Sequence, residues 1–132
     1  MVQYADLDDL GRLGLRKLAS AGLSDADLLA ALAAASELAD SYLRSQYKLP
    51  LASWGADVRR AVAMIAAWDI LSAQRGFNPD SPGDQIWLAR YEQAVAWFKD
   101  VAKGLVNPNV VDSTPRFRDG GPRVATLKRR GW

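Results

Sequence analysis

The chain has 132 residues with a net charge of +2, and 49% of them are hydrophobic, which is enough for one folded domain with a modest core. It contains no cysteine and no histidine. These two absences exclude disulfides, thiolate or histidine metal sites, and catalysis by a cysteine nucleophile or a serine–histidine–aspartate triad.

The first predicted element is a short helix in the acidic sequence of residues 6–10. Asp6 is a good N-cap, and Asp8 and Asp9 place carboxylates near the positive end of the helix dipole. Gly11 and Gly14 limit this helix to one or two turns. Three clustered aspartates are also compatible with a cation site, but the glycine and bidentate glutamate of an EF-hand loop do not follow, which favours capping.

The second predicted helix covers about residues 25–45. Ser24 and Asp27 have the spacing of a capping box, with aspartate in place of glutamate. Pro50 prevents continuation of the helix. Apolar residues follow at helical spacing and predict the buried face: Leu28, Leu32, Ala35, Ala39 and Tyr42.

Two further long helices follow, over about residues 56–75 and 83–103. The connector before the first of them, residues 47–54, contains Ser53 as a candidate cap. Gly76 and Gly104 are the expected C-terminal stops, and the loop between the helices is rich in turn-forming residues.

The aromatic residues of the last helix point in more than one direction. Trp87 and Trp97 are ten residues apart, about 80° short of three full turns. A helix that is apolar on several sides is either deeply buried or meets a second surface. Because aromatic residues are enriched in interface cores, we predict a subunit interface at Trp87, Trp97 and Tyr47, with core packing as the alternative.

Residues 105–132 lack a helical or strand period and predict an extended arm. The last 18 residues contain six basic residues and one acidic residue, whereas residues 1–40 are acidic. Residues 124–127 (Val-Ala-Thr-Leu) are compatible with a short strand if a partner offers an edge. Spaced apolar residues among the basic ones favour docking on a protein, with nucleic-acid binding and a solvated tail as alternatives. The predicted partner contacts are Arg116, Phe117, Arg118, Arg123, Leu127, Lys128, Arg129, Arg130 and Trp132.

Several segments together resemble a known family. They are the acidic start, the capped second helix, the third helix over residues 58–70, and the end of the last helix before Gly104. The most recognisable segment is the exit of the second helix, with Asp40, Tyr42, Leu43, Arg44, Tyr47, Leu49, Pro50 and Leu51. Over about residues 4–106 the chain resembles the Mu-like prophage family of small head–tail connector, or adaptor, proteins, long described as a domain of unknown function.

The resemblance implies a helical virion protein at the head–tail junction, the neck, which is present in the host cytoplasm during assembly. Related adaptors form a ring, commonly of twelve subunits, beneath the portal. The implied partners are the portal protein, a tail or stopper protein and further copies of the chain, while DNA only passes non-specifically through the channel. The family has no catalytic motif to transfer, and the arm lies beyond the region of resemblance.

We therefore predict an all-α fold, a small bundle of one short N-terminal helix and three longer helices, with an extended C-terminal arm. The expected domains are residues 1–104 and 105–132. The expected function is a structural connector that is not an enzyme and has no cofactor, metal or membrane span. The alternative is a small helical nucleic-acid-binding protein that uses the tail as a basic arm.

Overall fold

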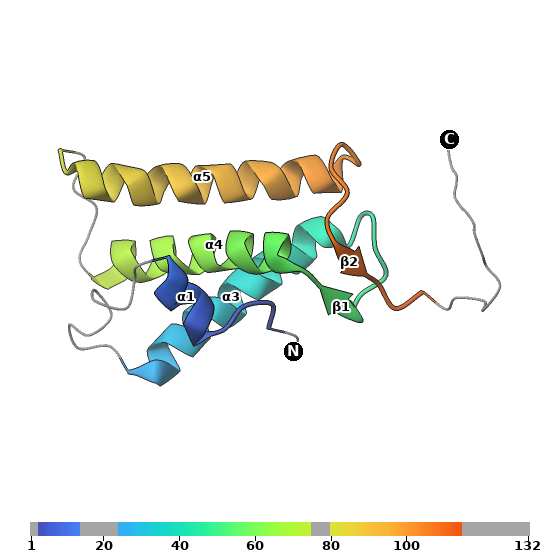
Figure 1. Ribbon diagram of the computed structural model, residues 1–132, viewed down its shortest axis with the longest axis horizontal. Helices are drawn as coiled ribbons and strands as arrows, with labels where there is room; N and C mark the ends of the chain where they lie inside the picture. The colour runs from blue at the N-terminus through green and yellow to red at the C-terminus, as the bar shows by residue number, and fades with distance from the viewer. Residues whose placement is uncertain (1–2, 14–23, 75–79, 115–132) are drawn as a thin grey trace.

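Helices dominate the parts of the chain that the structure, a computed structural model, describes: residues 3–13, 24–74 and 80–114 (Figure 1). The fold is all-α, as predicted, and these ranges contain one short helix near the N-terminus and three longer ones. The predicted arm beyond residue 114 lies outside the described residues. In chain order the elements are α1 (Leu7–Arg12), α3 (Asp25–Leu43), β1 (Ser53–Trp54), α4 (Ala56–Gln74), α5 (Pro82–Ala102) and β2 (Val110–Val111).

Side-chain caps fix where the helices begin. Two of the three predicted N-caps are confirmed: Asp6 forms a capping box with Asp9, and Ser24 forms one with Asp27. Ser81 caps α5 by accepting the amide of Asp84, a cap that the sequence analysis missed. Ser53, the predicted cap of the third helix, lies in β1 instead, because extended pairing continues until Gly55.

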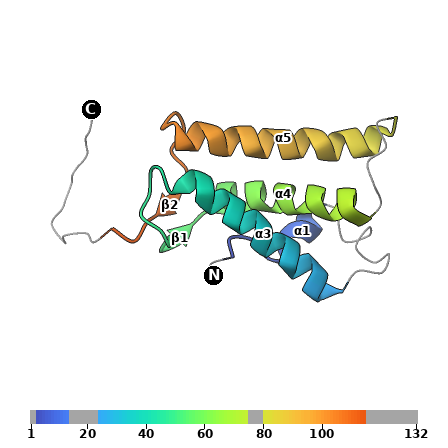
Figure 2. The same ribbon diagram turned by 180° about the vertical axis from the view of Figure 1, so that it is seen from behind.

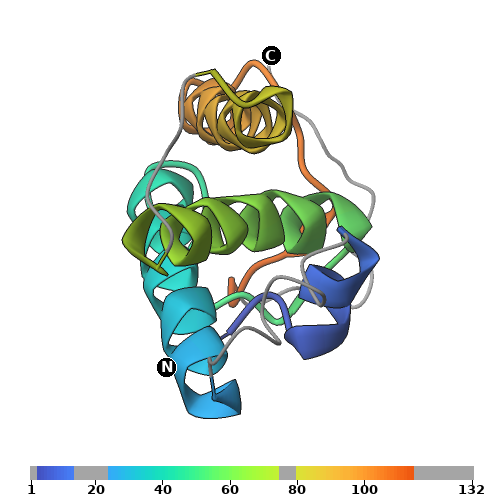
Figure 3. The ribbon, with the colours of Figure 1, turned by 90° about the vertical axis from the view of Figure 1, so that its left-hand side faces the viewer.

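The core is built around α4. Residues 61–67 of this helix are all buried, so its middle turns have no solvent-facing side. α3, α5 and α1 all contact α4, and the end-on view shows them around it (Figure 3). The small side chains of this alanine-rich helix allow neighbours to pack on every side of its middle turns.

α3 and α5 meet at their C-terminal ends, which Figure 2 shows next to each other. The rings of Tyr42 and Phe98 stack with centroids 6.2 Å apart. The side chains of Ser45 and Gln46 both donate hydrogen bonds to the carbonyl oxygen of Ala102, at 3.1 and 3.0 Å. These bonds satisfy a carbonyl in the last turn of α5, where no amide of the same helix is available.

A two-stranded antiparallel ribbon joins the connector after α3 to the chain after α5. Ser53 pairs with Val111 and Trp54 with Val110. The ladder extends to the amide of Ser113, which donates to the carbonyl of Lys48 at 3.0 Å. The first ten residues of the predicted arm, 105–114, thus lie against the helical body. Two-residue strands leave no alternating pattern in a sequence, so the ribbon was not predicted.

None of the helices in the described ranges combines the length and the apolar character that a membrane crossing requires.

Candidate functional site

The three aromatic residues of the predicted interface lie on the body, and each is partly buried against its own chain. The guanidinium of Arg90 lies 4.8 Å from the ring centroid of Trp87. The ring of Trp97 meets Phe98 edge-on, with centroids 5.1 Å apart. Burial, with Asp112 and Asp57 nearby, raises the pKa of Tyr47. Their core contacts are therefore established, and a subunit contact through their exposed parts stays a prediction.

The outer row of α5 faces solvent along the whole helix. Ile86 is 54% exposed, more than Leu29 of α3, which is 39% exposed. Ala89, Gln93 and Ala96 continue this row at helical spacing, and all are exposed. α5 thus has one face on the core and one without cover from the described residues (Figure 1).

A second exposed row runs along α3. Leu29 is 39% exposed, and Ala30, Ala34 and Glu37 extend the exposed surface along the helix. No lysine or arginine occurs between Ser24 and Leu43. The outer surface of α3 is consequently a mixture of small apolar side chains and carboxylates.

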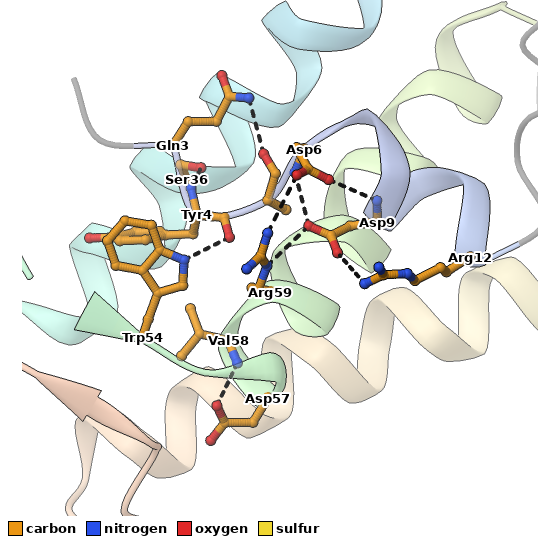
Figure 4. A network of polar contacts seen from close by, with 11 residues as sticks. Gln3, Tyr4, Asp6, Asp9, Arg12, Ser36, Trp54, Asp57, Val58 and Arg59 are labelled. Carbon is orange, nitrogen blue, oxygen red and sulfur yellow. Dashed lines mark hydrogen bonds and ion pairs between the residues drawn. The ribbon is translucent and has the colours of Figure 1, made fainter.

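The N-terminal segment is anchored to α3 and β1 through Tyr4, which is 1% exposed (Figure 4). Its amide donates to Ser36 Oγ at 3.0 Å, and its hydroxyl donates to the carboxylate of Asp40. The indole N–H of Trp54 donates to the carbonyl oxygen of Tyr4 at 2.9 Å. Burial, together with the neighbouring Asp40, raises the pKa of Tyr4 above its ordinary value.

Arg59 of α4 holds α1 through two carboxylates (Figure 4). Its Nε lies 3.3 Å from Asp9 and its Nη2 lies 3.4 Å from Asp6. The Asp9 side chain is only 7% exposed and also pairs with Arg12 at 3.3 Å. The pKa of Asp6 lies below its ordinary value, first because its carboxylate accepts the backbone amide of Asp9, and also because of the nearby positive charge of Arg59.

Two open depressions lie on either side of Arg59, with volumes of about 350 and 200 Å³. The larger lies between the N-terminal segment and β1, and the smaller lies beside α1. Asp6, Asp9, Arg12 and Arg59 are all engaged in ion pairs with one another, and the two pairs of Arg59 fasten α1 to α4. Within the described residues, no three carboxylate, histidine or cysteine side chains gather to hold a metal ion.

The predicted partner residues of the arm, from Arg116 to Trp132, lie outside the described residues. The sequence analysis also missed the roles of Tyr4 and Arg59, because their partners are 32 to 53 positions away along the chain. The acidic start gives one signal of the Arg59 contact, because Asp6 and Asp9, which cap α1, are also the carboxylates that Arg59 binds.

Comparison with known proteins matches the chain to one family. The model of the family described as "Bacteriophage Mu, Gp36" matches residues 2–125 of this chain. A search of curated proteins found no match. The match covers the whole described body and reaches into the arm, further than the resemblance noted from the sequence.

Proposed function

Because this chain belongs to the bacteriophage Mu Gp36 family, which indicates a phage structural or assembly protein, we propose that it is a head–tail connector. It forms a ring, of twelve subunits as in related adaptors, that joins the portal to the tail or stopper protein around the DNA channel. It is part of the virion at the neck, and it performs no catalysis. The family match over residues 2–125 is the observation that carries this proposal.

The exposed rows of α5 and α3 support self-assembly. A ring requires each subunit to present two different surfaces, one for each neighbour. The exposed side chain of Ile86 and the partly exposed Trp87 and Trp97 of the same helix provide apolar area that a neighbour can bury. Burial of such a row removes apolar surface from water in every subunit contact of the ring.

The arm supplies the contact with the portal or a neighbouring ring. The described chain is held to the body as far as Ser113, whose amide donates to the carbonyl of Lys48, so the chain is fixed beside the ribbon just before the basic part of the arm. Its basic residues and spaced hydrophobic residues fit a protein surface that offers acidic and apolar contacts. Several arms from one ring bind cooperatively through their high effective concentration, even when one arm binds weakly.

The charge of the body gives no support to nucleic-acid binding outside the basic tail. Acidic residues outnumber basic ones among the described residues, and Arg12 and Arg59 already pair with carboxylates. Such a surface suits the wall of a channel along which DNA must slide, because strong phosphate binding would hold the DNA in place.

Cryo-electron microscopy of intact phage particles tests the proposal. We expect density for this chain as a closed ring between portal and tail, with the arm running along a neighbouring protein. Absence of the chain from intact particles would overturn it.

A binding assay separates the two functions and tests the arm. The full chain should co-purify with the portal protein, and the chain ending at Thr114 should not. Arg60→Gln is the control, because Arg60 is an exposed basic residue of α4, away from the arm. Binding to DNA that weakens with a log–log salt slope near −5, without portal binding, would support the alternative function.

A further inference from the structure

A leucine directly after α5 is exposed and yet held in place by the backbone. Leu105 is 72% exposed, the highest value among the large hydrophobic residues of the described chain. Its amide donates to the carbonyl oxygen of Asp100 at 2.9 Å, and the amide of Gly104 donates to that of Val101 at 3.0 Å. These two bonds, with the positive φ of Gly104, form a Schellman motif, which fixes the position of Leu105.

The side chain of Leu105 does not have the usual apolar partner of such a motif. The residue after the glycine commonly packs against an apolar side chain three or four positions before the helix end. In this chain those positions are Asp100 and Lys99, and both are charged. Leu105 is therefore an apolar side chain on a fixed backbone, without cover from its own helix.

Exposed cations lie at the same end of the molecule as Leu105. α3 ends beside the end of α5, as the hydrogen bonds to Ala102 show, and the ribbon lies next to both (Figure 2). The cations come from all three elements or their flanks, and together with Leu105 they form the α5-end surface: Arg44, Lys48, Lys99 and Lys103.

These four cations have no partners within the described part of the chain. Elsewhere on the body, Arg12 and Arg59 pair with carboxylates, and Arg90 donates to a backbone carbonyl. None of the four cations of the α5-end surface forms an ion pair with a described carboxylate. The carboxylates of Asp57 and Asp112, at the same end, accept the backbone amides of residues 109 and 48 instead, at 2.8 and 3.1 Å.

The lysines are not required as hydrogen-bond donors at the end of α5. The last four carbonyl oxygens of a helix have no amide partner in the regular helical pattern. In α5 these are the carbonyls of residues 99–102, and all four accept other donors, which are the amides of residues 103–105 and the side chains of Ser45 and Gln46. Lys99 and Lys103 therefore remain available to a partner.

We propose that the α5-end surface binds the portal protein together with the arm. This inference rests on the proposed function and extends its partner contact from the arm to the body. An apolar residue inside a charged rim is the usual arrangement of a protein interface, so Leu105 enters an apolar pocket and the cations meet carboxylates around it. The basic arm continues from the ribbon at this same end, so a protein that binds the arm is brought to Leu105. Phosphate binding alone would not use an apolar centre.

The apolar centre is tested by binding of the full chain to the portal protein, with the chain dilute enough to remain monomeric. Leu105→Ser should raise the dissociation constant about ten-fold or more, mainly through faster dissociation, because truncation of a buried interface anchor has effects of this size. Leu29→Ser is the matched control, since Leu29 is an exposed leucine near the start of α3, at the opposite end of the molecule (Figure 1). This control should bind like wild type.

The charged rim is tested by a charge reversal. Lys103→Glu should slow association several-fold, and the difference from wild type should shrink as salt is added, because rim charges act mainly on the encounter rate. Arg60→Glu makes the same change at an exposed arginine beside α1 and should have no such effect. Circular dichroism of each variant shows whether it is folded, and all four substituted side chains are exposed, so each should keep the wild-type melting temperature.

The outcomes separate this inference from the proposed function. Wild-type affinity of both Leu105→Ser and Lys103→Glu would overturn the α5-end contact and leave a connector that binds the portal through its arm alone. Weaker binding of Leu105→Ser to a tail protein, to DNA or to a second copy, with portal binding unchanged, would overturn the portal as the partner of this surface. Failure of the wild-type chain to bind the portal protein would overturn both proposals.

Discussion

Tyr4 shows how much a single residue contributes to positioning the N-terminus. Its ring is buried against Trp54, with centroids 4.8 Å apart, and its polar atoms bond to α3 and to the indole of Trp54. A sequence pattern has no signal for such a contact, because it depends on one side chain meeting partners far along the chain. The sequence pattern marks only the aspartates of the acidic start, whereas in the structure Tyr4 anchors that start to the body.

Tyr4→Phe should lower the free energy of unfolding by about 2 kcal/mol. The substitution keeps the ring but removes the hydroxyl that donates to Asp40, and hydrogen bonds to charged groups contribute about 1.5–3 kcal/mol. Urea unfolding monitored by tryptophan fluorescence measures the change. Tyr42→Phe is the matched control, because the ring of Tyr42 stacks on Phe98 and the substitution keeps that contact. Equal losses in both variants would mean that the Asp40 bond contributes nothing specific.

The stability that Tyr4 contributes should depend on pH in the alkaline range. The pKa of Tyr4 is raised in the folded chain, so the folded state holds its proton above pH 10, where the unfolded chain loses it. The stability that Tyr4 contributes is therefore complete below pH 10 and decreases as the pH rises above it. The difference between wild type and Tyr4→Phe should shrink above pH 10. A constant difference up to pH 11 would contradict the assigned cause.

At the scale of elements, local signals predicted the helices well. Ser24, Asp6 and Gly104 mark helix ends that depend only on neighbouring residues, and all three act as expected. The predicted ends of the three long helices lie within two residues of the observed ones. The ribbon was missed for the opposite reason, since the pairing of Trp54 with Val110 joins distant segments and each strand is two residues long. The sequence pattern does not distinguish the outer rows of α3 and α5 from the buried faces of the same helices, because alanine is compatible with both.

Gly104→Ala should destabilise the chain by about 1 kcal/mol. Gly104 ends α5 with φ at +79°, a conformation in which a Cβ atom is strained. Gly83→Ala is the control in the first turn of the same helix, where the added Cβ meets only Ser81 Oγ at 3.8 Å. This control should be neutral or stabilise the chain by up to about 1 kcal/mol, because alanine favours the helix. Thermal unfolding followed by circular dichroism compares the two variants. Similar melting temperatures for both would show that the left-handed conformation at residue 104 costs nothing.

At the scale of the whole molecule, the segment after α5 has two parts that differ in charge and in their contacts with the body. Residues 105–114 are fixed to the body: Pro108 is buried, and the amide of Asn109 donates to Asp57 at 2.8 Å. The basic residues that follow from Arg116 onward are the ones that the proposed function assigns to a partner protein. The segment after α5 therefore combines a structural part with a predicted binding part. A sequence-based boundary at residue 104 reflects the end of helical periodicity, which is a property of α5 alone.

Two truncations locate the end of the folding unit. A chain that ends at Thr114 should melt within roughly 2 °C of the full chain, because it retains the ribbon and the contacts of Pro108. A chain that ends at Gly104 loses the backbone bonds to Ala52, Gly55 and Lys48 and uncovers apolar surface beneath them. These losses amount to about 3–5 kcal/mol, so the melting temperature should fall by roughly 10 °C or more. Calorimetry of the three chains measures this difference. Equal melting temperatures for all three would instead place the domain boundary at residue 104, and the whole of residues 105–132 would then be available to a partner.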